Sequence, residues 1–292
     1  MTLFKEIMSY QPIIIIGAPR SGTNILRDVL CSIQGVNTWP CDEINYIWRH
    51  GNINSLTDEF TPDMARIEVK NFIQKSFDQQ AAKEKIDFLV EKTCANSLRV
   101  PYVDRVIPNA KYIFIVRDGV DVVGSAALRW KASLNFLYII KKVRYVPFFD
   151  LFFYSFRYFS SRIYKLFSKE QRLSFWGPQF KGLDAALTQN SLEEVCMLQW
   201  QRCVNLSEQA FQQMDNDRVV RVKYEDFVSA PVEELTRIMQ ELKIPFKSEQ
   251  VRTAVKLVTS KSIGKGRQAL NKDQLKAILK LSSKTLNRYG YE

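Results

Sequence analysis

The sequence predicts an α/β fold in which helices cover both faces of a central parallel sheet. Two short runs, at 12–17 and 112–116, are almost continuously apolar, as strands buried on both faces of a sheet are. Each run leads through a short loop into residues whose apolar positions recur at helical spacing. Strands that alternate with helices in this way indicate a parallel sheet between layers of helices.

The elements follow one another without an internal repeat, a low-complexity run or a linker. We therefore expect one domain over residues 1–292, a length that can bury a sizeable core. The expected strands lie at 12–17, 87–91, 112–116 and 218–223, and the expected helices at about 23–34, 98–107, 119–130, 130–170, 191–214, 231–242 and 270–289. Mixed helical sequence extends to about residue 86, and a helical, aromatic-rich insertion occupies about 130–190.

Composition is typical of a globular protein, with 46% hydrophobic and 25% charged residues. A net charge of +11 is common among proteins that bind nucleic acid. However, the sequence contains no helix-turn-helix, zinc-finger or RNP-like signature, so we expect no nucleic-acid partner.

The cysteines and the first residues bear on metal binding and location. The five cysteines form no CxxC pair and the only histidine is His50, so no metal site is expected. Such cysteine usage favours reduced thiols in the cytoplasm. The first residues lack the apolar segment of a signal peptide, and no run approaches the ~20 apolar residues of a membrane helix.

A glycine-containing loop joins the first strand to the first helix, with the sequence Gly17-Ala18-Pro19-Arg20-Ser21-Gly22-Thr23-Asn24. Such a loop directs backbone N–H groups and the positive end of a helix at an anion. Its glycine spacing matches a Walker A loop, but Thr23 stands where that motif has lysine, and the cation is Arg20. The loop therefore favours a phosphate-like ligand over ordinary ATP or GTP hydrolysis. The alternative is a tight turn with an exposed arginine.

A second anion site is predicted where the strand at 112–116 ends. Arg117 follows that strand directly, and Ser125 lies eight residues later in the next helix. In open α/β sheets, ligands bind outside the carboxyl ends of the strands, so both loops should face one crevice. The alternative for Arg117 is a local ion pair with Asp118 on the surface.

Taken together, these segments resemble the sulfotransferases that use 3′-phosphoadenosine-5′-phosphosulfate (PAPS). The resemblance rests on Ala18-Pro19-Arg20-Ser21-Gly22-Thr23, on Arg117 to Ser125, on Val219 to Phe227 with Ala230-Pro231, and on the tail from Ser262 to Arg267. It covers nearly the whole chain in order, except about 129–192, and is closest to bacterial members and to the tyrosylprotein and carbohydrate branch. It implies a P-loop-like three-layer α/β/α fold.

The resemblance also implies the residues that bind PAPS, with no metal required. The 5′-phosphosulfate would lie on Arg20, Ser21, Gly22, Thr23 and Asn24. The 3′-phosphate would lie on Arg117 and Ser125, and the adenine near Tyr224. Lys265, Gly266 and Arg267 would form a loop over the phosphates, or else a solvated basic loop; family members often carry tryptophan at the place of Gly266.

Three residues are implied in catalysis. Lys92 corresponds to the lysine that stabilises the departing bridging oxygen, and Arg20 supports the phosphosulfate. The histidine base of many cytosolic members is absent, because Cys94-Ala95-Asn96 follows the Lys-Thr pair. In another branch a glutamate serves as base, and Glu43 is the better match; Asp42 and His50 remain alternatives, and Asp42 or Glu43 could instead cap a helix near Ile44.

The acceptor is expected to carry a hydroxyl, on a carbohydrate, a glycoconjugate such as a lipid-linked glycan, or a protein tyrosine. The stretch 130–176 is rich in aromatic and basic residues and nearly free of acids. It is either a helical cap on the sheet or a surface for peripheral contact with an anionic membrane, at the inner face of the cytoplasmic membrane. A P-loop nucleotide kinase or nucleotide-binding module, and a non-catalytic binding protein, are the competing interpretations.

Overall fold

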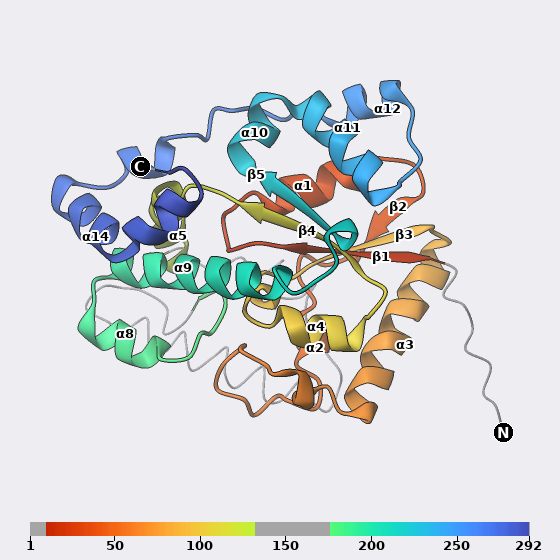
Figure 1. Ribbon diagram of the computed structural model, residues 1–292, viewed down its shortest axis with the longest axis horizontal. Helices are drawn as coiled ribbons and strands as arrows, with labels where there is room; N and C mark the ends of the chain where they lie inside the picture. Colours follow the sequence, from red (N-terminus) through yellow and green to blue (C-terminus); the bar gives the residue numbers. More distant parts are fainter. Residues whose placement is uncertain (1–9, 132–175, 292) are drawn as a thin grey trace.

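Five parallel strands form the centre of the computed structural model, which describes residues 10–131 and 176–291 (Figure 1). The strands lie in the order β2-β3-β1-β4-β5, and every neighbouring pair is parallel. Their bounds are β1 Gln11–Ile16, β2 Val36–Thr38, β3 Phe88–Lys92, β4 Lys111–Val116 and β5 Val219–Lys223. The predicted α/β fold with a central parallel sheet is therefore confirmed.

Helices cover both faces of the sheet and give it three layers (Figure 1). The core that contains Ile13 and Ile15 is closed by α1 (Thr23–Leu30), α10 (Tyr224–Ser229), α11 (Pro231–Leu242) and α12 (Ser248–Ala254). The core that contains Ile14 and Ile16 is closed by α2 (Asn45–Trp48), α3 (Ile67–Glu84), α4 (Val100–Val106), α5 (Gly119–Lys131), α8 (Leu183–Gln189), α9 (Leu192–Phe211) and α14 (Lys272–Arg288). Successive residues of β1 thus enter opposite cores, as the pleat of a strand requires.

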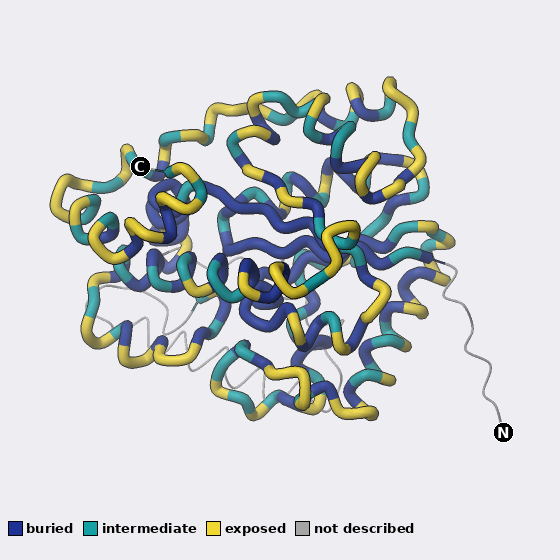
Figure 2. The backbone as a smooth tube through the Cα atoms, in the orientation of Figure 1, coloured by how far each residue is buried: buried dark blue, intermediate teal, exposed yellow. Residues whose placement is uncertain are grey.

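The position of each strand in the sheet explains its sequence. Ile13 to Ile16 of β1 are fully buried, because β1 is the middle strand with helices on both faces (Figure 2). In the edge strand β5, Val220 and Val222 are buried, whereas Arg221 and Lys223 are exposed. Charged residues at the sheet edge discourage pairing with another chain.

Most predicted elements are present within a few residues of their expected bounds. Two elements of the structure were not predicted. The three residues of β2 carry too weak a pattern, and α10 begins directly after β5 without a loop. The expected helix at 98–107 is present as α4, and the 3-10 helix η2 (Cys94–Leu98) precedes it. The expected helix at 130–170, and most of the insertion at 130–190, lie outside the described residues.

The carboxyl ends of the strands define where a site can form. The loop after β1 leads into α1, the loop after β4 leads into α5, and β3 and β5 end beside them in the same parallel sheet. The segments that follow these four strands therefore meet at one edge of the sheet. This edge contains Arg20, Lys92, Arg117 and Tyr224.

Candidate functional site

The loop after β1 has an unusual backbone conformation. Arg20 has a φ of 70°, and Gly22, the N-cap of α1, has a φ of 89°. A side chain on Gly22 would overlap the ring of Tyr224. The Ser21 hydroxyl is fully buried, and no described residue offers it a hydrogen-bond partner. The loop therefore leaves a buried donor available next to the start of a helix, which suits an oxyanion.

The loops after β1 and β4 are joined by hydrogen bonds. The Arg20 Nε atom donates to Ser125 Oγ on α5 at 2.9 Å. Arg117 donates to the carbonyl of Arg20 at 3.2 Å. Burial, together with the neighbouring guanidinium groups of Arg129 and Arg117, lowers the pKa of Arg20. Arg20 thus lies near two further arginines, and such a group of positive charges suits a highly charged anion.

Arg117 lies at the centre of this arrangement and is almost completely buried. Its guanidinium lies over the ring of Tyr224, 4.4 Å from the ring centroid, and donates to the carbonyl of Ser262 at 2.7 Å. It also forms an ion pair with Asp121 on α5, at 3.3 Å. Its Nε atom is buried and has no hydrogen-bond partner among the described residues.

The segment before α14 is attached to α5 by Asp121, which is fully buried. The Asp121 carboxylate accepts backbone N–H groups from Gly264 (2.7 Å), Gly266 (2.9 Å) and Arg267 (3.1 Å). Here the short helix α13 (Lys265–Gln268) approaches α5 so closely that a side chain on Gly266 would overlap the Asp121 backbone. Of the two basic residues in this segment, Lys265 is exposed and Arg267 is half-buried.

The segment after β5 supports the same edge of the sheet. The Tyr224 hydroxyl shares a hydrogen bond of 2.5 Å with the Ser262 hydroxyl. Glu225 accepts the backbone N–H of Asp118 at 3.0 Å, and the Tyr291 hydroxyl donates to the other Glu225 oxygen at 2.7 Å. These contacts hold the loop after β4 against β5 and the end of the chain.

Lys92 and Glu43 form an ion pair, with Nζ and Oε1 3.0 Å apart. The Lys92 side chain is 1% exposed and that of Glu43 is 25% exposed, so the carboxylate is the more open group of the pair. Burial opposes the charge on Lys92, but Glu43 and other nearby groups outweigh it and raise the pKa of the lysine. Glu43 also accepts the backbone N–H of Cys94 at 3.4 Å, and Cys94 Sγ lies 3.8 Å from Thr23 Oγ1 in the glycine loop.

The structure separates the three candidate bases. Asp42 is 4.0 Å from Lys92, but it accepts hydrogen bonds from Arg27 at 2.7 Å and Asn24 at 3.3 Å. His50 stacks on Phe72, with ring centroids 3.7 Å apart. The N-cap residue of α2 is Ile44, whose side chain makes no capping hydrogen bond, so neither Asp42 nor Glu43 is the cap of that helix. Glu43 therefore makes the shortest ion pair with Lys92.

Sequence reasoning missed several residues that hold the site together. Asp121 and Ser262 connect Arg117 to the segment before α14, and Trp200 of α9 donates from Nε1 to the Arg117 carbonyl at 3.1 Å. Only Asp121 leaves a signal in the sequence, because it lies four residues after Arg117 on a helix and can pair with it. The other two contacts join residues 83 and 145 positions apart.

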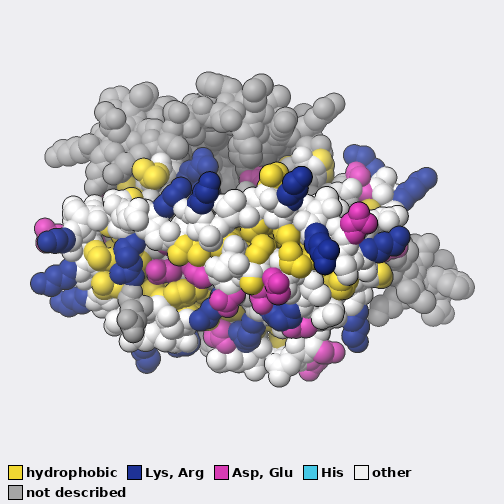
Figure 3. All heavy atoms as spheres, turned by 90° about the horizontal axis from the view of Figure 1, so that it is seen from above, with side chains coloured by type: hydrophobic (Ala, Val, Ile, Leu, Met, Phe, Trp, Pro, Cys, Tyr) yellow, Lys and Arg dark blue, Asp and Glu magenta, His cyan; other side chains and the backbone are white. Residues whose placement is uncertain are grey.

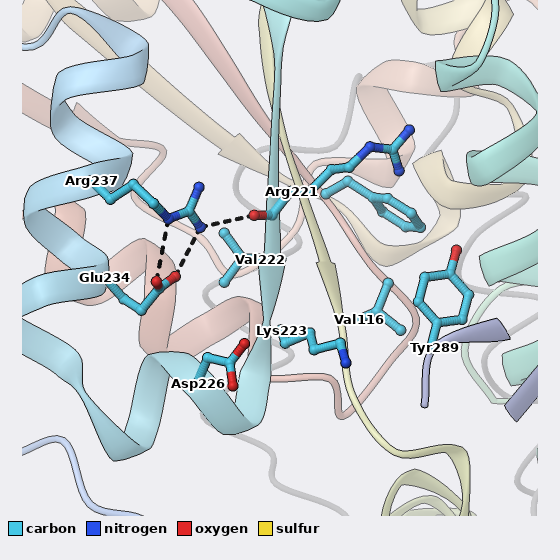
Figure 4. A pocket seen from close by; sticks show the side chains of 9 residues that line it. Val116, Arg221, Val222, Lys223, Asp226, Glu234, Arg237 and Tyr289 are labelled. Atoms are coloured by element: carbon cyan, nitrogen blue, oxygen red, sulfur yellow. Dashed lines mark hydrogen bonds and ion pairs between the residues drawn. The ribbon is translucent and has the colours of Figure 1, made fainter. Parts of the chain in front are cut away.

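A pocket of about 400 Å³ lies elsewhere, beside the edge strand β5 (Figure 4). None of the predicted site residues lines it. Its two arginines already have acidic partners, Arg237 with Glu234 and Arg221 with Glu208. The pocket is therefore separate from the predicted site.

The described surface does not concentrate its positive charge on the face shown in Figure 3, where basic and acidic side chains are interspersed. None of the helices among residues 10–131 and 176–291 is long and apolar enough to cross a membrane. The predicted membrane contact at 130–176 falls almost entirely on residues outside the described ranges.

Comparison with known proteins identifies the family. A family model described as the sulfotransferase family matches residues 12–144 and 163–248, which is more than half of the chain. This match enters the region around 129–192, in which the motif resemblance was not seen. No curated protein matches the chain in sequence.

Solved structures share the fold at low sequence identity. The sulfotransferase domain from the curacin biosynthetic pathway has a TM-score of 0.56 at 15% identity, over 97% of this chain and 98% of its own. The sulfotransferase domain from the Synechococcus PCC 7002 olefin synthase has a TM-score of 0.51 at 16% identity, over 94% and 95%. Sulfotransferase STF9 from Mycobacterium avium has a TM-score of 0.53 at 12% identity, over 97% and 78%. With the family match, these findings show that the chain is an enzyme of the sulfotransferase family.

Proposed function

We propose that this enzyme transfers the sulfuryl group of PAPS to the hydroxyl of an acceptor. The observation that carries the proposal is the Lys92–Glu43 ion pair beside two joined anion-binding loops. When bound, PAPS supplies the sulfuryl group and leaves as adenosine 3′,5′-bisphosphate. Two buried atoms in these loops, Ser21 Oγ and Arg117 Nε, have no hydrogen-bond partner among the described residues. They fit such a donor, since each needs an acceptor and the two loops would each hold one of its anionic ends.

The binding residues follow from the loops that the structure joins. Ser21, Gly22, Thr23 and Asn24 would hold the 5′-phosphosulfate through hydroxyl groups and the N–H groups that open α1. Arg117 and Ser125 would hold the 3′-phosphate. Arg20, which donates to Ser125, would lie between this phosphate and the 5′-phosphosulfate.

The adenine would lie near Tyr224. The segment Lys265–Arg267 would cover this part of the site, held in place by the backbone N–H groups that donate to Asp121. Gly266 acts there through its backbone, because its Cα is packed on α5. Lys265 and Arg267 bring two further positive charges to the same segment.

The catalytic roles follow from charge and exposure. Glu43 takes the proton of the acceptor hydroxyl at its carboxylate, which is partly open to solvent. Lys92 stays protonated, because the neighbouring carboxylates raise its pKa, and its charge stabilises the negative charge of the departing oxygen. Arg20 adds positive charge to the same loop.

A kinase or nucleotide-binding module is not supported, because the chain belongs to the sulfotransferase family and Thr23 replaces the Walker lysine. For the acceptor, we propose a hydroxyl of a carbohydrate or glycoconjugate. The support is the resemblance of the chain as a whole to the tyrosylprotein and carbohydrate branch, and a tyrosine peptide is therefore the second arm of the acceptor screen.

Calorimetry with adenosine 3′,5′-bisphosphate and with ATP tests the donor. We expect the bisphosphate to bind and ATP to bind far more weakly, and Arg117→Ala to lose about tenfold to a hundredfold in bisphosphate affinity. Arg252→Ala, which removes an exposed arginine of α12, is the matched control and should bind normally. Tight binding of ATP without binding of the bisphosphate would overturn the proposal.

Transfer of ³⁵S from labelled PAPS to a panel of oligosaccharides, a tyrosine peptide and simple phenols tests the reaction. Lys92→Ala and Glu43→Gln should each lower kcat by at least about a hundredfold while bisphosphate affinity stays within a few fold. A Glu43→Gln variant with normal kcat would remove Glu43 from the base role, and turnover of the peptide alone would replace the carbohydrate assignment.

A further inference from the structure

Glu91 is a fully buried carboxylate immediately before Lys92, and the mechanism above gives it no role. Its two oxygens have different partners. Oε1 accepts the Thr93 hydroxyl at 2.5 Å, and Oε2 accepts the Asn96 side-chain amide at 3.0 Å. A buried acid normally costs stability, so its retention beside the catalytic pair needs an explanation.

The Thr93 hydroxyl connects Glu91 to the loop that carries Glu43. The Thr93 Oγ1 atom donates its proton to Glu91 and accepts the backbone N–H of Ile44 at 3.1 Å. The hydroxyl has one proton and two lone pairs, so donating to Glu91 turns the proton away from Ile44 and leaves a lone pair facing its N–H. Ile44 follows Glu43 directly, so this bond fixes the position of the Glu43 backbone at the end of β3.

The other side of Glu91 is also fixed. The Asn96 Oδ1 atom accepts Arg99 Nε at 2.9 Å, which orients the Asn96 amide so that its NH₂ group faces Glu91. The charged groups around Glu91 are Lys92 and Glu43 at the site and Arg99 behind it. A glutamine at position 91 has one acceptor oxygen instead of two, so it cannot accept hydrogen bonds from both the Thr93 hydroxyl and the Asn96 NH₂ group.

We propose that Glu91 is a positioning residue that holds Glu43 at the end of β3 through the Thr93 hydroxyl and the Ile44 N–H. The inference rests on the proposed role of Glu43 as the base. Glu91 itself touches no reactant, since it is sealed beneath the pair. Its effect on turnover therefore passes entirely through the position of Glu43.

Hydrogen exchange of the Ile44 amide, measured without any acceptor or donor, tests the link directly. We expect exchange at Ile44 to become at least about tenfold faster in Glu91→Gln and in the isosteric Thr93→Val, because each breaks the same chain of bonds. Thr93→Ser keeps the hydroxyl and should restore wild-type exchange. Glu68→Gln, on the exposed face of α3, is the control for loss of a carboxylate. Unchanged exchange in Thr93→Val would overturn the inference.

Kinetics separate positioning from a general loss of structure. We expect Glu91→Gln and Thr93→Val to lower kcat by about tenfold to a hundredfold with little change in bisphosphate affinity. The double variant Glu43→Gln, Glu91→Gln should be no slower than Glu43→Gln alone, because Glu91 acts only through Glu43.

The two proposals can fail separately. A Glu43→Gln variant with normal kcat contradicts the proposed base, whatever Glu91 does. If Glu43→Gln is slow but Glu91→Gln keeps its kcat within twofold, the base stands and the positioning role is wrong. Additive losses in the double variant would also reject that role.

Discussion

The Arg20 side chain bonds to Ser125 Oγ, at 2.9 Å, across the gap between the loop after β1 and helix α5. These two residues come from two predicted anion-binding motifs that are about a hundred positions apart in the sequence. The Arg117 guanidinium reinforces the link through the Arg20 carbonyl. The backbone of Arg20 has a φ of 70°, a region that costs a non-glycine residue free energy. The strain and the bond together indicate that this arginine is retained for its side chain.

Replacing Arg20 by glycine and by alanine separates these two contributions. Both variants lose the bond to Ser125, so both should bind adenosine 3′,5′-bisphosphate more weakly by a similar factor. Alanine is strained in this left-handed conformation and glycine is not. The free energy of unfolding of Arg20→Gly should therefore be about 1 kcal/mol larger than that of Arg20→Ala. Chemical denaturation and calorimetry measure the two effects. Equal stability of the two variants would mean that the loop relaxes out of the left-handed region.

Gly22 and Gly182 form a matched pair, since both are helix N-caps with φ near 90°. A Cβ on Gly22 would overlap the Tyr224 ring, whereas a Cβ on Gly182 would meet no atom within 4 Å. Gly182→Ala should therefore cost only the backbone strain of about 1 kcal/mol. Gly22→Ala should cost about 1–3 kcal/mol more and weaken bisphosphate binding. Thermal denaturation and calorimetry on both variants check this.

A second substitution tests the cause of the Gly22 effect. Tyr224→Ala removes the ring that a Gly22 side chain would overlap. The double variant should therefore be more stable than the sum of the single losses predicts. Strict additivity would place the cost of Gly22→Ala in the backbone rather than in the contact with Tyr224.

The sequence predicted the central strands because they are buried on both faces and leave continuous apolar runs. Ile13 to Ile16 carry this signal without interruption. The edge strand β2 carries none, since only Val36 of its three residues is buried. The other edge strand, β5, was nevertheless predicted at 218–223, so β2 escaped prediction because its three residues are too few to carry a pattern.

The site was predictable only as far as local motifs extend. Arg20, Arg117 and Lys92 each follow a strand, so their convergence follows from the parallel sheet. The partners that hold them do not. Ser262 reaches Arg117 from 145 positions away, and no local pattern encodes that contact. The branch and the acceptor stay predictions, because the residues at 132–175 are outside the described structure.

Asp121 connects the Arg117 site to the segment before α14, and Asp121→Asn tests that link. Its carboxylate accepts three backbone N–H groups, and an amide would turn its NH₂ group towards at least one of them. We expect bisphosphate affinity to fall about tenfold to a hundredfold and limited proteolysis between residues 257 and 270 to become faster. Asp273→Asn, at an exposed position at the start of α14, is the control. Unaltered affinity together with unaltered proteolysis would show that the segment is held by other contacts.

The raised pKa of Glu91 predicts how the free energy of unfolding depends on pH. Burial raises its pKa to about 7, against the opposing hydrogen bond from Thr93. A carboxyl with a raised folded pKa holds its proton in the folded state after the unfolded chain, with a pKa near 4.5, has lost it. Its contribution to stability is therefore complete below about pH 4.5 and is lost as the pH rises to about 7.

Glu91→Gln has no such proton, so the free energy of unfolding of the variant minus that of the wild type should increase by about 1 kcal/mol per pH unit between pH 5 and 7 and level off by pH 8. Urea denaturation at each pH measures this difference, and its slope is independent of any constant cost of the substitution. A difference that does not change between pH 5 and 7 would mean that Glu91 is ionised throughout and that Thr93 and Asn96 outweigh its burial.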